Sequence, residues 1–182
     1  LQPEVCITPF ISDDILKANF NYNIPHAQEI LSQAVLAFRN NMKRLTDSKT
    51  FVYFTADGLL QFAASGRTAE IPDVFYHQFT VEQRIQMLHG VAESCLNGTY
   101  RILQKPLNHL PSNLHLCIRG NVGTLIFQKY NDEVMLFTIQ EYGLLETFLD
   151  YLQNMHESSF YTSDEASAYI QNIISRLKNG EL

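Results

Sequence analysis

The chain has 182 residues, a net charge of −6 and a pI near 5.4. Its 13 Lys and Arg residues are scattered among 19 acidic ones, which argues against direct nucleic-acid binding by this chain, because phosphate binding needs clustered basic side chains. No apolar run reaches the roughly 20 residues of a membrane span. Three cysteines without paired spacing, Cys6, Cys95 and Cys117, indicate reduced thiols in a cytoplasmic protein.

The first segment, residues 1–24, has no clear period, and its apolar side chains alternate with Pro and Asp. We expect a docked arm or the end of a linker here, with one helical turn after Ser12. Residues 25–182 should then form a single domain. The chain starts at Leu1 without an initiator Met, and its first residues lack the basic start and apolar core of a signal peptide. We expect it to be the back part of a longer protein.

Helical periods and capping signals mark most of the remaining elements. Apolar residues at spacings of three and four predict a helix over residues 26–45. A Thr or Ser followed three residues later by Glu or Gln favours a helix start, and Gly favours a helix end. These signals predict a brief helix at 59–63 before Gly66, a helix from the capping box at 80–83 to Gly98, and a helix from the box at 162–165 to Gly180. Residues 68–78 read as a loop.

Aromatic and β-branched runs predict strands at 51–55 and 100–103. Three further strands are expected at 113–119, 124–130 and 133–140, followed by a helix at 141–155. The turns between these three strands are so short that they favour an antiparallel meander. We therefore predict a mixed α/β (α+β) fold, in which a sheet with a C-terminal three-stranded antiparallel meander is covered by amphipathic helices.

No known catalytic motif is present. His115, Cys117 and Arg119 share one strand face, and His and Cys two residues apart could ligate a metal. No second pair with ligand spacing exists, so we assign no metal, cofactor or catalytic residue; this face is expected to be exposed, or to line a shallow pocket where Arg119 meets an anion. A hydrolase-like enzyme in which His115 or His89 meets a carboxylate or thiol, and a protein-interaction module, remain alternatives.

Several stretches are similar to one family of regulators. Residues 51–68 read FVYFTADGLLQFAASGRT, residues 79–88 read FTVEQRIQML, and FLDYL at 148–152 is followed by YTSDE at 161–165. Together they resemble the C-terminal regulatory region of helix-turn-helix transcriptional regulators from Firmicutes, over roughly residues 25–178. The resemblance carries over no functional residues. It implies a cytoplasmic sensor or dimerisation domain attached to an upstream DNA-binding domain.

We therefore expect a non-catalytic regulatory domain that senses a small-molecule effector, forms a homodimer, or does both. DNA would be bound only through the upstream domain, and no membrane would be involved. An effector pocket would lie between the sheet and the helices, near Tyr53, Arg67, Tyr100 and Arg119.

Overall fold

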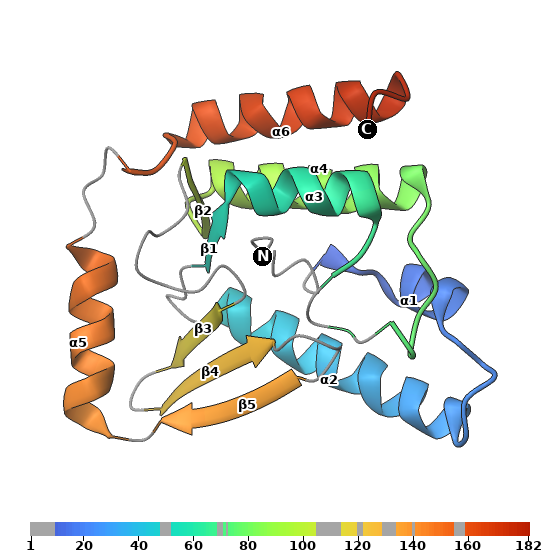
Figure 1. Ribbon diagram of the computed structural model, residues 1–182, viewed down its shortest axis with the longest axis horizontal. Helices are drawn as coiled ribbons and strands as arrows, with labels where there is room; N and C mark the ends of the chain where they lie inside the picture. The colour runs from blue at the N-terminus through green and yellow to red at the C-terminus, as the bar shows by residue number, and fades with distance from the viewer. Residues whose placement is uncertain are drawn as a thin grey trace.

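The structure is a computed structural model, which describes residues 10–47, 52–68, 71, 73–104, 114–119, 122–128, 134–139, 141–154 and 159–182. Its elements follow one another as shown in Figure 1: α1 (Asp13–Asn19), α2 (Ala27–Asp47), β1 (Val52–Thr55), α3 (Ala56–Ser65), α4 (Val81–Leu96), β2 (Tyr100–Leu103), β3 (Leu114–Arg119), β4 (Val122–Gln128), β5 (Val134–Ile139), α5 (Tyr142–Gln153) and α6 (Ser163–Lys178).

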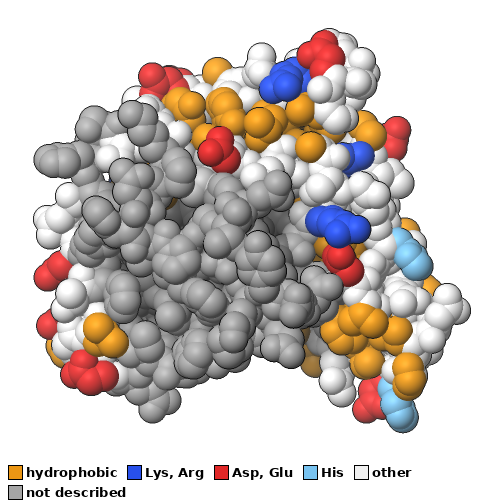
Figure 2. Space-filling view, viewed as in Figure 1, with side chains coloured by type: hydrophobic (Ala, Val, Ile, Leu, Met, Phe, Trp, Pro, Cys, Tyr) orange, Lys and Arg blue, Asp and Glu red, His pale blue; other side chains and the backbone are white. Residues whose placement is uncertain are grey.

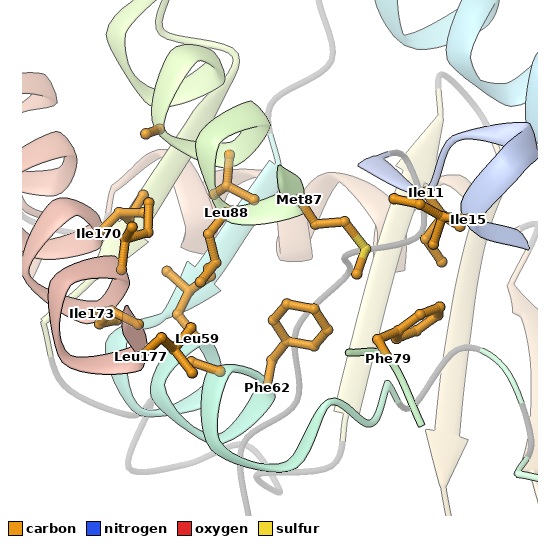
Figure 3. Packing of buried hydrophobic residues seen from close by; sticks show 14 of the residues in the cluster. Ile11, Ile15, Leu59, Phe62, Phe79, Met87, Leu88, Ile170, Ile173 and Leu177 are labelled. Carbon is orange, nitrogen blue, oxygen red and sulfur yellow. The ribbon is translucent and has the colours of Figure 1, made fainter. Parts of the chain in front are cut away.

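The described core is built from three helices, α3, α4 and α6, which run side by side in Figure 1. Each presents an apolar stripe to the other two, and Figure 3 shows Ile173 and Leu177 of α6 close to Leu59 of α3. Fully burying an aliphatic side chain contributes roughly 1.5–3 kcal/mol. The largest side chains that the core buries completely include Leu59, Phe79, Met87, Leu88, Val91, Ile170, Ile173 and Ile174.

A pair of short parallel strands lies against these helices. β1 and β2 pair from Val52 opposite Tyr100 to Thr55 opposite Leu103. Parallel strands need a long crossover connection, and here α3 and α4 supply it. β2 packs on α4 and α6, while β1 leads directly into α3. The two parallel strands are therefore held against the helical core by the helices that connect and cover them.

The predicted helix signals are confirmed where the structure describes them. Thr80 and Gln83 cap α4 reciprocally, with the Thr80 N–H donating to Gln83 Oε1 at 2.9 Å and the Gln83 N–H to Thr80 Oγ1 at 3.3 Å. Thr162 and Glu165 form the second capping box at the start of α6. Gly66 ends α3 with a φ of 63°. These signals succeed because each depends on residues only a few positions apart.

The predicted fold class is wrong. Most of the regular structure described is helical, and no sheet among the described residues joins β1 and β2 to the later strands. β4 pairs antiparallel with β3 on one side and with β5 on the other, and these three strands form a separate sheet. α5 contacts this sheet at β4. The expected sheet covered by helices is therefore replaced by helices packed on helices. An apolar stripe shows that a helix buries one face, but it does not show whether the partner is a sheet or another helix.

The part of the N-terminal segment that the structure describes, from residue 10 onward, belongs to the same core. Ser12 caps α1 by accepting a hydrogen bond from the N–H of Ile15 at 3.3 Å. Ile15, Leu16 and Phe20 are buried in the cluster that also contains the residues of α3, α4 and α6. α1 also packs on α2. Seven residues are too few for a helix to be stable alone in water, so these tertiary contacts hold α1 in place.

Candidate functional site

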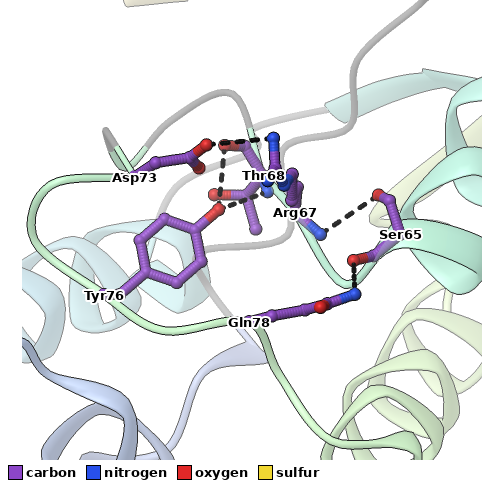
Figure 4. Close-up of polar contacts among 6 residues, drawn as sticks. All are labelled: Ser65, Arg67, Thr68, Asp73, Tyr76 and Gln78. Atoms are coloured by element: carbon purple, nitrogen blue, oxygen red, sulfur yellow. Dashed lines mark hydrogen bonds and ion pairs between the residues drawn. The ribbon is translucent and has the colours of Figure 1, made fainter.

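A cluster of polar contacts lies where the chain passes from α3 to α4. Figure 4 shows its six residues: Ser65, Arg67, Thr68, Asp73, Tyr76 and Gln78. It begins at the end of α3, where the Gly66 N–H donates to the Phe62 carbonyl at 2.8 Å. The Gln78 side-chain amide donates to the Ser65 carbonyl, and the Arg67 N–H donates to Ser65 Oγ at 3.2 Å. The last turn of α3 is thus tied to the chain that returns towards α4.

Tyr76 occupies the centre of this cluster. Its hydroxyl accepts a hydrogen bond from the Thr68 N–H at 2.8 Å and donates one to the Thr68 carbonyl at 3.3 Å. Only 4% of the Tyr76 surface is exposed, and its ring stacks on Phe79 with centroids 5.2 Å apart. Burial raises the pKa of the Tyr76 hydroxyl, and the hydrogen bonds with Thr68 partly oppose this shift. The phenol is therefore a neutral structural group at physiological pH.

The two charged residues of the cluster lie on its surface. Arg67 Nη1 and Asp73 Oδ2 are 3.2 Å apart, with both side chains substantially exposed. An exposed ion pair of this kind contributes at most about 1 kcal/mol, because water and salt screen it. Figure 4 shows the pair bridging the two arms of the loop next to Tyr76. This ion pair joins the two arms of the loop at the surface, and the hydrogen bonds between Tyr76 and Thr68 join them in the interior.

A buried cation supports the junction from α4. Arg84 is 8% exposed, and its Nη1 donates to the carbonyl of Ala63 and, at 3.0 Å, to that of Ala64. Its Nε donates to the Thr80 carbonyl at 3.4 Å. Burial lowers the pKa of the guanidinium. Because these donors are directed at main-chain carbonyls of the last turn of α3, Arg84 acts as a cap for that helix.

The four residues predicted to face a ligand lie in three different places. Tyr53 on β1 is in register with Arg101 on β2, beside Tyr100. Tyr100 is 4% exposed, and its ring lies 5.0 Å from that of Phe10, so it packs as a core residue. Arg67 follows the far end of α3, which is about 15 Å long at 1.5 Å per residue. Arg119 lies on β3, opposite Val122. The structure thus places Tyr53 and Tyr100 on neighbouring strands, Arg67 in the loop after α3, and Arg119 on β3.

The remaining chemical candidates give no described constellation. The side chains of His115 and Cys117 lie outside the part of the chain whose side chains are described, and His89 is exposed on α4. Among the described residues, no group of three or more His, Cys, Asp or Glu side chains is suited to a metal ion. None of the helices described combines the length and apolarity required to cross a bilayer.

Two exposed apolar residues lie beside the junction. Tyr22 is 48% and Val74 55% exposed. They come from segments that are hydrogen-bonded to each other, since the Asn21 side-chain amide donates to the Val74 carbonyl at 2.9 Å. Figure 2 shows hydrophobic side chains gathered at this corner, next to the turn between α1 and α2. We call Tyr22 and Val74 the corner patch.

Comparison of the chain with protein-family models, with curated proteins and with solved structures finds no match. Of the six residues of the junction cluster (Figure 4), only Arg67 was among the predicted ligand-facing residues, whereas Thr68, Asp73, Tyr76 and Gln78 fall in the stretch read from sequence as a loop without a period. The one sequence signal available was its content of Tyr, Asp and Thr just after a Gly helix end, which is typical of many surface loops.

Proposed function

We propose that this chain is a non-catalytic regulatory domain of a bacterial transcriptional regulator, in the cytoplasm, and that it acts by forming a homodimer. Its DNA-binding domain would be a separate segment, since the acidic composition of this chain disfavours contact with phosphates. The proposal rests on the resemblance of residues 51–68 and 79–88 to such regulators, and on the corner patch. In this proposal, a small effector is a ligand that binds one assembly state more tightly than the other and so favours that state.

The corner patch is the observation that carries the self-association. Tyr22 and Val74 are each about half exposed, and they sit on segments held together by the hydrogen bond from Asn21. Apolar side chains that gather on a surface favour contact with another protein, since burying them releases ordered water. A two-fold dimer buries the same surface on both subunits, and the corner patch would be that surface.

The chemistry of the junction cluster also favours a non-catalytic role. Tyr76 bonds to the main chain of Thr68, Gln78 to that of Ser65, and Arg84 to that of α3. General acid–base catalysis needs a titratable side chain placed to reach a substrate proton. These polar side chains are instead hydrogen-bonded to main-chain atoms, which is typical of groups that stabilise a fold.

Light scattering of this chain over a range of concentrations tests the proposal. We expect the mass to rise from 20.9 kDa for one chain towards twice that value. Val74→Lys should weaken association at least tenfold by placing a charge in the patch. Leu36→Lys is the matched control, because Leu36 is 61% exposed on α2 and its replacement makes the same change in charge. A wild-type chain that stays monomeric at every concentration would overturn the proposal, as would equal effects of the two variants.

A further inference from the structure

The N-terminal segment and the loop before α4 are joined by a short antiparallel contact. The His77 N–H donates to the Asn19 carbonyl at 2.6 Å, and the Asn21 N–H donates to the Phe75 carbonyl at 2.9 Å. Between these bonds Phe20 and Tyr76 form an isolated bridge. The two segments are more than 50 residues apart in sequence, so this contact connects α1 to the α3–α4 junction.

One residue of that contact reaches further. Tyr76 lies in the bridge through its backbone, while its hydroxyl binds both the N–H and the carbonyl of Thr68. Its ring stacks on Phe79, which is 1% exposed and immediately precedes the Thr80 cap of α4. Tyr76 therefore fastens three stretches of chain together: the end of α1, the start of the loop after α3, and the start of α4.

We propose that Tyr76 is a clasp that sets how often the segment from α1 to Tyr22 opens away from the α3–α4 junction. With the clasp closed, the segment carrying Tyr22 and the loop carrying Val74 are hydrogen-bonded to each other through Asn21, and this contact holds the corner patch together. With the clasp open, the segment carrying Tyr22 separates from the loop carrying Val74, and the patch is taken apart. The clasp thereby couples the position of the N-terminal segment to self-association; this last step rests on the proposed function.

The contacts explain why opening would be local. α1 has only seven residues and depends on packing for its stability. The side chains that anchor the segment from α1 to Tyr22 are Ile15, Leu16 and Phe20, which are few compared with the apolar faces shared by α4 and α6. Segments with fewer buried contacts open at lower free energy than the global unfolding of the domain. Removing the two hydrogen bonds of the Tyr76 hydroxyl would leave the Thr68 N–H and carbonyl without that partner, which favours the open state.

Amide hydrogen exchange of the whole chain tests the clasp. Tyr76→Phe keeps the ring and removes the hydroxyl, and we expect amide exchange in α1 and at Asn21 to rise about tenfold. Exchange in α4 and α6 should stay within about twofold of wild type. Tyr169→Phe is the matched control, because it removes a hydroxyl that donates to the Ala56 carbonyl at 3.0 Å, away from α1. It should leave exchange in α1 unchanged.

A uniform rise in exchange across the domain, or no rise in α1, would overturn the clasp. Should Tyr76→Phe fail to fold, Asn21→Ala serves as the milder variant. It removes the side-chain bond to the Val74 carbonyl and should raise exchange in α1 severalfold. Light scattering of the same variants separates the two proposals. Local opening in a chain that never dimerises would leave the clasp standing and reject the proposed function, whereas a dimer without local opening would do the reverse.

Discussion

Arg84 Nη1 lies 3.0 Å from the carbonyl oxygen of Ala64, so that a side chain of α4 caps the carboxyl end of α3. The last four carbonyls of a helix lack partners within the helix, and the negative end of the helix dipole favours a cation there. Gly66 closes the same turn through its backbone. Two independent devices, one of charge and one of backbone conformation, therefore fix the point at which α3 ends and the junction begins.

Replacement of this cation should lower stability markedly. Arg84→Met keeps most of the side-chain volume but removes the donors to the carbonyls of Ala63 and Ala64. Buried acceptors left without a donor cost about 1–3 kcal/mol, and we expect the free energy of unfolding in urea to fall by that amount. Arg67→Met is the control, since the exposed pair with Asp73 should be worth less than about 1 kcal/mol. Equal losses in the two variants would show that Arg84 does not act as a cap.

The role of the left-handed Gly66 at the end of α3 can be tested by comparing it with a second glycine of positive φ, Gly98. Gly66 and Gly98 both have positive φ, 63° and 79°, so that an Ala at either position is strained. A Cβ on Gly66 would also lie 2.8 Å from the carbonyl oxygen of Phe79, whereas one on Gly98 would meet nothing within 4 Å. Gly98→Ala should therefore cost about 1–2 kcal/mol, and Gly66→Ala clearly more. Thermal unfolding of the two variants measures the difference, and identical melting temperatures would contradict the close approach.

Local signals in the sequence were enough to place many helix ends. The capping box at Thr80 and Gln83, and the left-handed Gly66, involve residues close in sequence, and each was predicted correctly. The element against which each apolar helix face packs was not predicted correctly. The stripe of α4 that buries Met87 and Leu88 meets α6 and α3, and nothing in its spacing distinguishes those partners from a sheet. That ambiguity is why the fold class was predicted wrongly.

The contact between the N-terminal segment and the loop before α4 was beyond prediction for a different reason. Asn21 and Val74, and Asn19 and His77, are joined across more than 50 residues, and no periodic pattern records such a contact. Tyr100 was expected near an effector pocket, and its ring packs against Phe10 in the interior. A tyrosine serves either use equally well, so its type alone cannot decide.

Alkaline pH should destabilise the domain through Cys95. The thiol is 1% exposed on α4, and burial raises its pKa from 9.0 to about 11. The folded state therefore keeps a proton that the unfolded state loses. The stabilisation from this thiol is complete below pH 9 and is lost as pH rises through the interval from 9 to 11. For a shift of this size the loss between pH 8 and 11 is roughly 2 kcal/mol.

Urea unfolding followed by circular dichroism at several pH values measures this loss, with Cys95→Ala as the comparison. The variant should be less stable than wild type at pH 7, because a smaller side chain leaves a cavity. Its stability should nevertheless fall less steeply than that of wild type between pH 9 and 10. In this interval the titration of the Cys95 thiol accounts for most of the difference in slope between the two proteins. Above pH 10 both proteins should lose stability, since burial also raises the pKa of Tyr76 and Tyr169. Parallel curves from pH 8 to 10 would show that Cys95 titrates as it does in the unfolded chain.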